Sequence, residues 1–338
     1  IFNRISAQKQ AAKNGRRDPD HDFGTNPCSE IILRPHQFCN LTEVVVRNGD
    51  KDEDLIRKVK IATILGTAQS TLTKFPYLRK VWQYNTQEER LLGVSLTGIM
   101  DNILTNGKLV DMDKRLTNLK QVAIDTNIEY AEKFGIQPST AITCVKPSGT
   151  VSQLCDSASG IHARHSEYYI RTVRGDNKDP LTKFMIDQGV SSEPCVMKPD
   201  TTTVFSFPMK SPRGSRMRDD MSALEQLRVW MMYQEWWCEH KPSITVTVKE
   251  DEWFDVGAFV FKNFDKMSGV SFLPHSDHVY QQAPYQECTE EEYNDMISNT
   301  TTRIDWSKLK DFEKGDTTSG SQTMACSGDS CEIVDIGA

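Results

Sequence analysis

Hydrophobic side chains recur at helical spacing in several parts of the chain. Between Asp52 and about Thr73, the residues Leu55, Val59 and Ala62 lie three or four positions apart, which places them on one face of a helix. Two other segments begin with a Ser/Thr-x-x-Glu capping box, a signature of a helix start. Together these signals predict helices over residues 52–73, 85–103, 111–134, 222–238, 252–264 and 289–297.

Shorter segments follow an extended pattern instead. The run from Ile244 to Val248 alternates hydrophobic and polar residues, as a half-buried strand does. Extended segments are also predicted at 30–33, 41–46, 141–145, 168–173 and 203–207. Strands that alternate with helices predict an α/β sheet or barrel. The stretch from Asp111 to Gly149 contains no GxGxxG or Walker A pattern, so the common nucleotide-binding folds have no support.

Composition describes a globular protein. The 338 residues include 38% hydrophobic and 26% charged residues, and 40 basic against 47 acidic side chains give a net charge of −7. This acidic balance argues against a nucleic-acid or anionic-membrane partner, which would need a dense basic face. No apolar run approaches the roughly 20 residues that span a bilayer. The first 20 residues are polar and predicted to be irregular, and a start at Ile1 without Met suggests a fragment.

Nine cysteines without a secretory signal imply a reducing compartment, and hence a cytoplasmic protein. No CxxC pair is present, and Cys238 with His240 is too weak a pattern to predict a metal site. Cys326 and Cys331 lie in a polar stretch too poor in hydrophobic residues to pack a core. We interpret them as a mobile dithiol that carries electrons, with a metal-scavenging or fortuitous pair as the alternative.

The run Asn26-Pro27-Cys28-Ser29-Glu30 is the densest group of reactive side chains. Pro27 disfavours the α region for Asn26, so an extended segment is expected. In a strand, side chains at i, i+2 and i+4 share one face, which would direct an amide, a thiol and a carboxylate into one pocket. A neighbouring carboxylate disfavours a thiolate, so chemistry with a neutral sulfur, such as hydrogen-atom transfer, fits better. A chance run before a strand is the alternative.

A second group of polar residues, Lys146-Pro147-Ser148-Gly149-Thr150-Val151-Ser152, follows the strand predicted at 141–145. Backbone N–H groups and hydroxyls at the end of a strand can bind an anion, more so where a helix begins. The same residue types also form ordinary turns. The pattern is therefore consistent with an anion site without requiring one.

These motifs together resemble the catalytic subunit of ribonucleotide reductases, and in particular the monomeric adenosylcobalamin-dependent (class II) ribonucleoside-triphosphate reductases. The resemblance covers the chain from about Gly24 to Cys331, with a spacing of 39 − 28 = 11 between Cys28 and Cys39 that suits this group. The matching segments are Asn26–Ile31, Phe38–Leu41, Arg90–Val94, Pro147–Thr150, Ser159–His162, the region from Glu252 to Tyr285, and the C-x4-C tail.

The resemblance implies a role for each motif residue. Cys28 resembles the cysteine that becomes a thiyl radical and removes the 3′-hydrogen of the ribose, and Glu30 the base that accepts the 3′-OH proton. Asn26 resembles the residue that hydrogen-bonds the substrate hydroxyls, and Cys39 one of the two thiols that end as a disulfide, with its partner upstream of this chain. The substrate phosphates would bind at Ser148, Gly149, Thr150 and Ser152, and the tail pair Cys326 and Cys331 would reduce the buried disulfide.

The resemblance also implies the architecture and the partners. Residues 21–310 would form the C-terminal half of a ten-stranded α/β barrel with a central finger loop. Residues 1–20 would be an irregular segment of a truncated chain, and 311–338 a flexible redox tail. The expected cofactor is adenosylcobalamin, the expected reductant thioredoxin or a similar dithiol, and the deoxynucleotide effector site would lie upstream. The isolated fragment is expected to be inactive.

Three alternatives to this interpretation stay open. The first is a non-catalytic dithiol or metal-binding protein, and the second is another radical enzyme with the same barrel. The third is a class I or class III reductase subunit. Class I subunits carry a tyrosine pair near the C-terminus, but Tyr168-Tyr169 lies far upstream. The class III glycyl-radical motif is matched only in part by Val173-Arg174-Gly175, which lies mid-chain.

Overall fold

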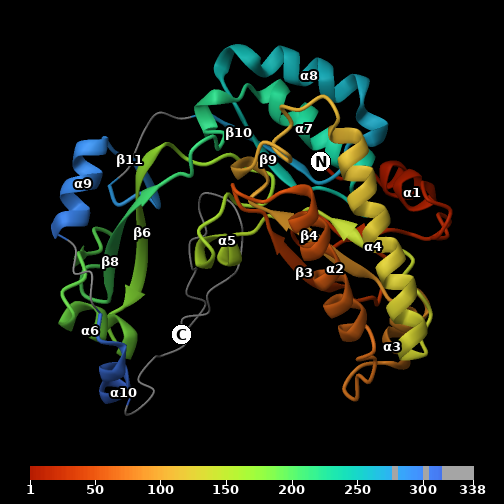
Figure 1. Cartoon of the computed structure of the whole chain (residues 1–338), viewed down its shortest axis with the longest axis horizontal. Helices are drawn as coiled ribbons and strands as arrows, with labels where there is room; N and C mark the ends of the chain where they lie inside the picture. The colour runs from red at the N-terminus through yellow and green to blue at the C-terminus, as the bar shows by residue number, and fades with distance from the viewer. Residues whose placement is uncertain (276–280, 300–303, 314–338) are drawn as a thin grey trace. The chain divides into compact units, whose positions relative to one another are not determined.

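The computed structural model describes residues 1–275, 281–299 and 304–313 (Figure 1). The chain divides into two compact units. The first unit comprises Ile1–Arg164 and Arg213–His275, and the second comprises His165–Pro212 together with the described residues after 275. The predicted redox tail, with Cys326 and Cys331, lies outside the described residues.

The first unit contains both predicted site motifs. Its helices are α1 (Arg4–Ala12), α2 (Asp52–Gln69), α3 (Lys80–Glu89), α4 (Met112–Phe134), α5 (Thr150–Leu154), α7 (Ala223–Trp236) and α8 (Trp253–Lys262). Its strands are β1 (Gly24–Thr25), β2 (Ile32–Leu33), β3 (Asn40–Val45), β4 (Leu92–Thr97), β5 (Thr143–Cys144), β9 (Ile244–Val248) and β10 (Val270–Pro274). Helix α1 corrects the expectation that the first 20 residues are irregular; Asn3 caps it by accepting a hydrogen bond from the Ile5 amide.

A parallel sheet of order β3-β4-β5 forms the centre of the first unit. All six residues of β4 are buried, and its sequence alternates the hydrophobic Leu92, Val94 and Leu96 with the small or polar Gly93, Ser95 and Thr97. This period of two indicates a strand. The helix predicted over 85–103 is therefore wrong beyond Glu89: α3 ends there, and β4 begins three residues later.

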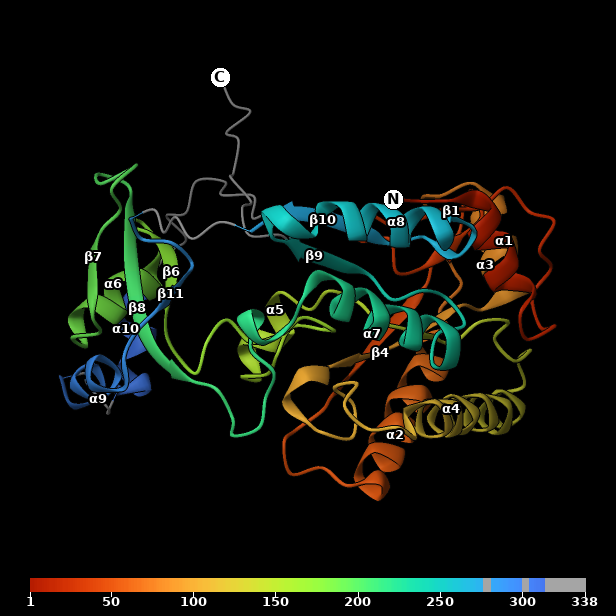
Figure 2. The same ribbon diagram turned by 90° about the horizontal axis from the view of Figure 1, so that it is seen from above.

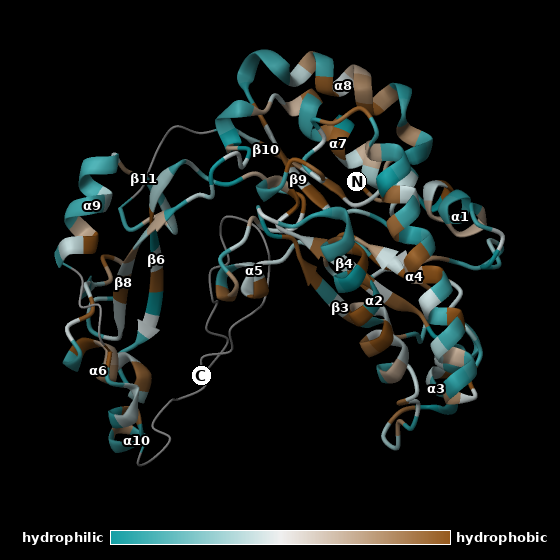
Figure 3. Cartoon of the chain, viewed as in Figure 1, coloured by the Kyte–Doolittle hydropathy of each residue, from teal (hydrophilic) through white to brown (hydrophobic). Residues whose placement is uncertain are grey.

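Helices α2, α4 and α7 cover this sheet and the β9-β10 pair. Helix α2 packs on β3 and β4, α4 packs on α2, and α7 contacts both α4 and β9 (Figure 1 and Figure 2). Strands β3 and β9 contribute hydrophobic residues to one continuous core, shown in brown in Figure 3. The capping box that begins α7 is confirmed, because Ser222 Oγ accepts from the Glu225 amide at 3.2 Å and Glu225 Oε2 accepts from the Ser222 amide at 3.0 Å.

The second unit is built on an antiparallel sheet of order β11-β6-β8-β7. Its strands are β6 (Tyr168–Asp176), β7 (Ser192–Pro194), β8 (Thr202–Lys210) and β11 (Tyr285–Glu287), and its helices are α6 (Pro180–Asp187), α9 (Glu290–Asn299) and α10 (Leu309–Phe312). The strands predicted at 168–173 and 203–207 are confirmed as parts of β6 and β8.

Both parallel and antiparallel sheets with packed helices confirm the predicted mixed α/β fold. Within the described residues the strands form sheets of two, two, four and three strands. The ten-stranded barrel and its finger loop stay predictions. Among the helices described, none is long and apolar enough to cross a membrane.

Candidate active site

Cys28 lies in the loop that joins β1 to β2, two strands that pair antiparallel. The loop is a turn and not the extended segment expected from the sequence: the Ser29 amide donates to the Asn26 carbonyl at 3.0 Å, and Ser29 has a positive φ of 63°. Pro27 favours such a turn, since its fixed φ suits the second turn position. The Asn26 side chain supports the loop, because its Oδ1 accepts a hydrogen bond from the Ile31 amide at 3.0 Å.

The turn still directs a thiol and a carboxylate to one place, and a lysine joins them there. Lys146 Nζ lies 3.7 Å from Cys28 Sγ and 3.5 Å from Glu30 Oε1. Glu30 is fully buried, whereas Cys28 is half-buried. Sequence reasoning placed Lys146 beside the anion-binding turn but gave no sign that it contacts Cys28, because the two residues are 118 positions apart.

Backbone hydrogen bonds fix the two sides of this cluster. The Glu30 carbonyl accepts from the Lys241 amide at 3.0 Å, which ties the Cys28 loop to the segment before β9. The Lys146 amide donates to Ser95 Oγ of β4 at 2.9 Å. The cluster is therefore anchored to the segment before β9 on one side and to the central sheet on the other, as a preorganised site requires.

Burial and neighbouring groups shift the pKa values of Lys146 and Cys39. Burial by itself lowers the pKa of Lys146, but the nearby Glu30 and Cys28 outweigh it and raise that pKa above its ordinary value. Burial, assisted by the negative charge of Glu30, raises the pKa of the Cys39 thiol well above its ordinary value. Cys39 is therefore a neutral thiol at physiological pH, which suits a group that delivers hydrogen and electrons together.

Cys39 immediately precedes β3 and lies against Gly93 of β4. A Cβ atom at position 93 would stand 3.2 Å from Cys39 Sγ and 2.4 Å from a methyl group of Leu41. A larger residue here would have to displace the Leu41 side chain and would crowd the Cys39 sulfur, which favours glycine. All seven cysteines among the described residues are free.

The four residues of the predicted phosphate-binding turn differ in their exposure to solvent. Ser148 and Ser152 are buried and bond within the fold: Ser148 Oγ donates to Glu43 Oε2 at 3.0 Å and accepts from the Ser152 amide at 3.2 Å. Gly149 and Thr150 are exposed where the short helix α5 begins. Glu43 of β3, which the sequence analysis missed, is the acceptor that holds the turn, and burial raises the pKa of its carboxyl group.

His240 supports the Cys28 loop from within the core and is not placed as a metal ligand. Its Nδ1 accepts from the Ile32 amide at 3.3 Å, and its Nε2 donates to the Leu92 carbonyl at 2.9 Å. Burial is the main cause that lowers the pKa of His240 to about 3. No group of three or more His, Cys, Asp or Glu side chains that could hold a metal occurs in the described part of the chain.

We expect the free energy of unfolding to fall on acidification because of His240. The unfolded chain binds a proton at this histidine below about pH 6.5, whereas the folded chain does so only near pH 3. Between these values the unfolded state holds one more proton, so stability falls by up to about 1.4 kcal/mol per pH unit. Urea denaturation between pH 7 and pH 4 measures this slope. In His240→Gln the slope should be smaller, and an unchanged slope would contradict the assignment.

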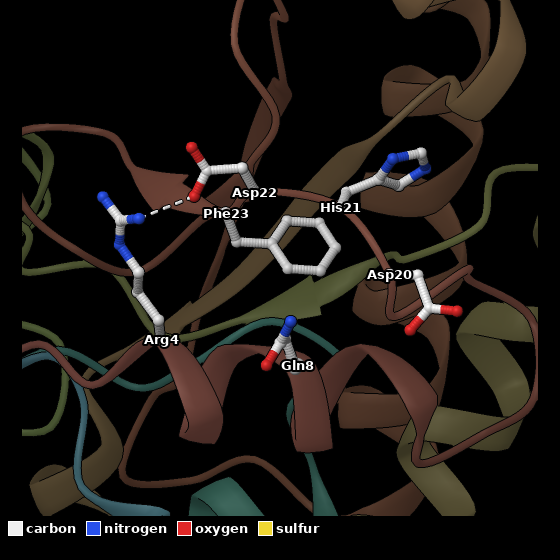
Figure 4. Close-up of a pocket in the computed structure, with 6 residues that line it drawn as sticks. All are labelled: Arg4, Gln8, Asp20, His21, Asp22 and Phe23. Atoms are coloured by element: carbon white, nitrogen blue, oxygen red, sulfur yellow. Dashed lines mark hydrogen bonds and ion pairs between the residues drawn. The ribbon is translucent and has the colours of Figure 1, made fainter.

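A separate pocket of about 350 Å³ lies between α1 and the segment that leads to β1 (Figure 4). Its lining comprises Arg4, Gln8, Asp20, His21, Asp22 and Phe23. The ion pair between Arg4 and Asp22, at 2.8 Å, is largely exposed to solvent and contributes little binding energy. None of the predicted site residues lines this pocket, so we assign the candidate chemistry to the Cys28 cluster.

Comparison with known proteins shows which proteins this chain resembles. No protein-family profile matches the chain. A probable adenosylcobalamin-dependent ribonucleoside-triphosphate reductase of Dictyostelium discoideum is 31% identical over 319 residues, which cover 92% of this chain and 40% of that protein. The adenosylcobalamin-dependent ribonucleoside-triphosphate reductase of Euglena gracilis is 27% identical over 94% of this chain and 43% of its own length.

Two solved structures show the same fold. A crystal structure of a B12-dependent (class II) ribonucleotide reductase superposes with a TM-score of 0.73 and 24% identity over 87% of this chain and 44% of that one. The class Id ribonucleotide reductase alpha subunit of Actinobacillus ureae gives a TM-score of 0.51 at 14% identity, over 81% of this chain and 57% of that one.

The chain is therefore similar to ribonucleotide reductases over most of its length. More specifically, the curated relatives that it matches are adenosylcobalamin-dependent ribonucleoside-triphosphate reductases, which confirms the resemblance predicted from the motifs and favours it over the alternatives. The chain spans less than half the length of these relatives.

Proposed function

We propose that the protein reduces ribonucleotides, as triphosphates, to 2′-deoxyribonucleotides by thiyl-radical chemistry. The observation that carries this proposal is the cluster of Cys28, Glu30 and Lys146 in a homologue of the reductases. The overall reaction consumes one ribonucleotide and two thiols, and it yields one deoxyribonucleotide, one disulfide and one water.

In this proposal Cys28 and Glu30 each handle one hydrogen of the substrate. The Cys28 sulfur, as a thiyl radical, takes the 3′-hydrogen atom and becomes a thiol, which leaves the unpaired electron on C3′. Glu30 accepts the 3′-OH proton, which makes departure of the 2′-hydroxyl as water easier. Cys39 and a partner thiol supply two electrons and two protons and form the disulfide, and the Cys28 thiol returns its hydrogen atom to C3′ to regenerate the radical.

Adenosylcobalamin is the proposed cofactor, and it would supply the unpaired electron to the Cys28 sulfur. A radical cofactor needs a hydrogen-atom donor within its reach. Cys28 fits this need because its thiol is free and half-buried, whereas Cys144 and Cys238 are fully buried in the core. Exclusion of water around Glu30, which is fully buried, would help to protect the radical from side reactions.

The Cys28 loop and the Ser148 turn would position different parts of the substrate. Asn26 uses its Oδ1 for the Ile31 amide, so its Nδ2 group is the one that would donate to a ribose hydroxyl. Ser148 and Ser152 would shape the turn through their buried hydrogen bonds. The exposed Gly149 and Thr150 would then offer a backbone N–H group and a hydroxyl to the phosphates.

The redox partners complete the proposal. Cys326 and Cys331 would exchange with the disulfide of Cys39 and then be re-reduced by thioredoxin or a similar dithiol. The partner of Cys39, the other half of the barrel and the deoxynucleotide effector site would belong to the part of the relatives that this chain does not cover. A reducing compartment such as the cytoplasm is proposed because the chemistry depends on free thiols.

The test is an assay of ribonucleoside triphosphate reduction by the full-length protein, with adenosylcobalamin and thioredoxin. We expect deoxyribonucleotide formation with the full-length protein and none with the 338-residue chain alone. Cys326→Ser should complete one turnover and then stop with thioredoxin, but continue with a small dithiol that reaches the active site directly. Absence of product from the full-length wild type would refute the proposed function, and sustained turnover of Cys326→Ser with thioredoxin would refute the tail role.

A further inference from the structure

The Glu30 carboxylate has fewer partners than a buried charge normally requires. Its side chain has no exposure to solvent, and an isolated buried carboxylate is strongly disfavoured unless a cation or hydrogen-bond donors compensate it. Among the described residues, Oε2 of Glu30 has no hydrogen-bond partner. The ion pair that compensates the charge is the one with Lys146, whose Nζ lies 3.5 Å from Oε1.

Lys146 is placed to serve both groups of the cluster. Its ammonium contacts the Glu30 carboxylate and the Cys28 sulfur at nearly equal distances, while one third of its side chain is exposed. Its backbone is fixed to β4 through Ser95, and it stands two residues before Ser148 of the turn. One side chain thus connects the predicted radical site to the predicted phosphate site.

The geometry pairs Lys146 with Glu30 in preference to Cys28. The Glu30 oxygen is the nearer of the two atoms to Nζ. Glu30 has no exposure to solvent whereas Cys28 is half-buried, so the carboxylate has the greater need of a counter-charge.

We propose that Lys146 is a positioning residue that holds the Glu30 carboxylate beside the Cys28 sulfur. This inference rests on the proposed function, in which Glu30 accepts the 3′-OH proton. A buried carboxylate needs a cation or hydrogen-bond donors to stay in place, and Lys146 supplies the cation.

The pairing can be tested without any activity. Competitive acetylation followed by peptide mass spectrometry measures the fraction of each lysine that is neutral. Glu30→Gln keeps the size of the side chain but removes its charge, so Lys146 at pH 9 should become about tenfold more reactive or more, as an ion pair at this range shifts a pKa by at least about one unit. Lys58 is the matched control, because its partner Asp50 is unchanged and its exposure is similar.

The role can be tested in the full-length enzyme by the separate effects on kcat and KM. Lys146→Met should lower kcat by about tenfold or more with little change in KM, since Glu30 loses the cation that holds it in place for the transition state. Lys146→Arg keeps the charge and should restore most of kcat. Lys58→Met removes another lysine ion pair in the same unit and should leave kcat and KM unchanged.

The outcomes separate this inference from the proposed function. Unchanged acetylation of Lys146 in Glu30→Gln would overturn the pairing, whatever the enzyme does. An unchanged kcat in Lys146→Met would overturn the role. If the full-length wild type reduces no ribonucleotide, the proposed function fails, and the acetylation result alone then decides whether Lys146 and Glu30 form the pair.

Discussion

Cys28→Ala should lower ribonucleotide reduction by the full-length protein by more than about a thousandfold, because loss of the group that carries the bond-making step typically removes nearly all of the rate. Alanine has no sulfur from which a radical could form, and no other described thiol contacts both Glu30 and Lys146. Nucleotide binding should survive, since the turn at Ser148 does not depend on Cys28. Product formation and nucleotide binding are measured in parallel.

The matched control for Cys28 is Cys155→Ala. Cys155 is also a free, half-buried thiol of the first unit. It directly follows α5, however, and is not part of the Cys28 cluster. This variant should keep its activity. Multiple turnovers by Cys28→Ala, or an equal loss in Cys155→Ala, would show that the position of the sulfur does not matter and would contradict the mechanism.

Glu30→Gln should reduce kcat by a factor of about 10²–10⁴, the usual contribution of a general base. The amide has almost the same shape as the carboxylate, so the fold should persist, but it cannot accept the 3′-OH proton. The loss should appear in kcat and kcat/KM alike, because the interaction is made in the transition state. Steady-state kinetics of the full-length protein, with circular dichroism to verify folding, measure this effect.

Glu43→Gln is the corresponding control for Glu30. Glu43 is another largely buried carboxylate close to Lys146, and its Oε2 accepts from Ser148. The amide oxygen of glutamine can still accept this hydrogen bond, so most of the activity should remain. If Glu30→Gln were no slower than Glu43→Gln, the assignment of Glu30 as the base would be wrong.

Local patterns in the sequence predicted most of the helices and strands. The helix at α2 follows from the spacing of Leu55, Val59 and Ala62, all of which the structure buries. The box at Thr289 is likewise confirmed, since its Oγ1 accepts from the Glu292 amide. Such signals succeed because capping and one-sided burial depend on residues only a few positions apart. The strand β4 was missed because the helix prediction was extended over 85–103, past the alternation of Leu92, Val94 and Leu96 that indicates a strand.

The candidate site was predicted in its residues but not in its geometry. The sequence placed Asn26, Cys28 and Glu30 together through an extended segment, whereas the structure brings Cys28 and Glu30 together through a turn with a positive φ at Ser29. Either conformation places Cys28 and Glu30 in one cluster. In the turn, however, the Asn26 side-chain oxygen also accepts a hydrogen bond from the Ile31 amide. Turn chemistry at a proline outweighed the local preference for extension.

By itself the sequence determined which thiol and which carboxylate are neighbours and which segments form helices, since these depend on covalent proximity and local pattern. Tertiary structure alone decided that Lys146 stands between Cys28 and Glu30 and that Glu43 holds the Ser148 turn. These contacts join residues more than 100 positions apart. The packing of the β1-β2 loop and of β3 against the segment after β5 sets them, and no periodicity along the chain encodes that packing.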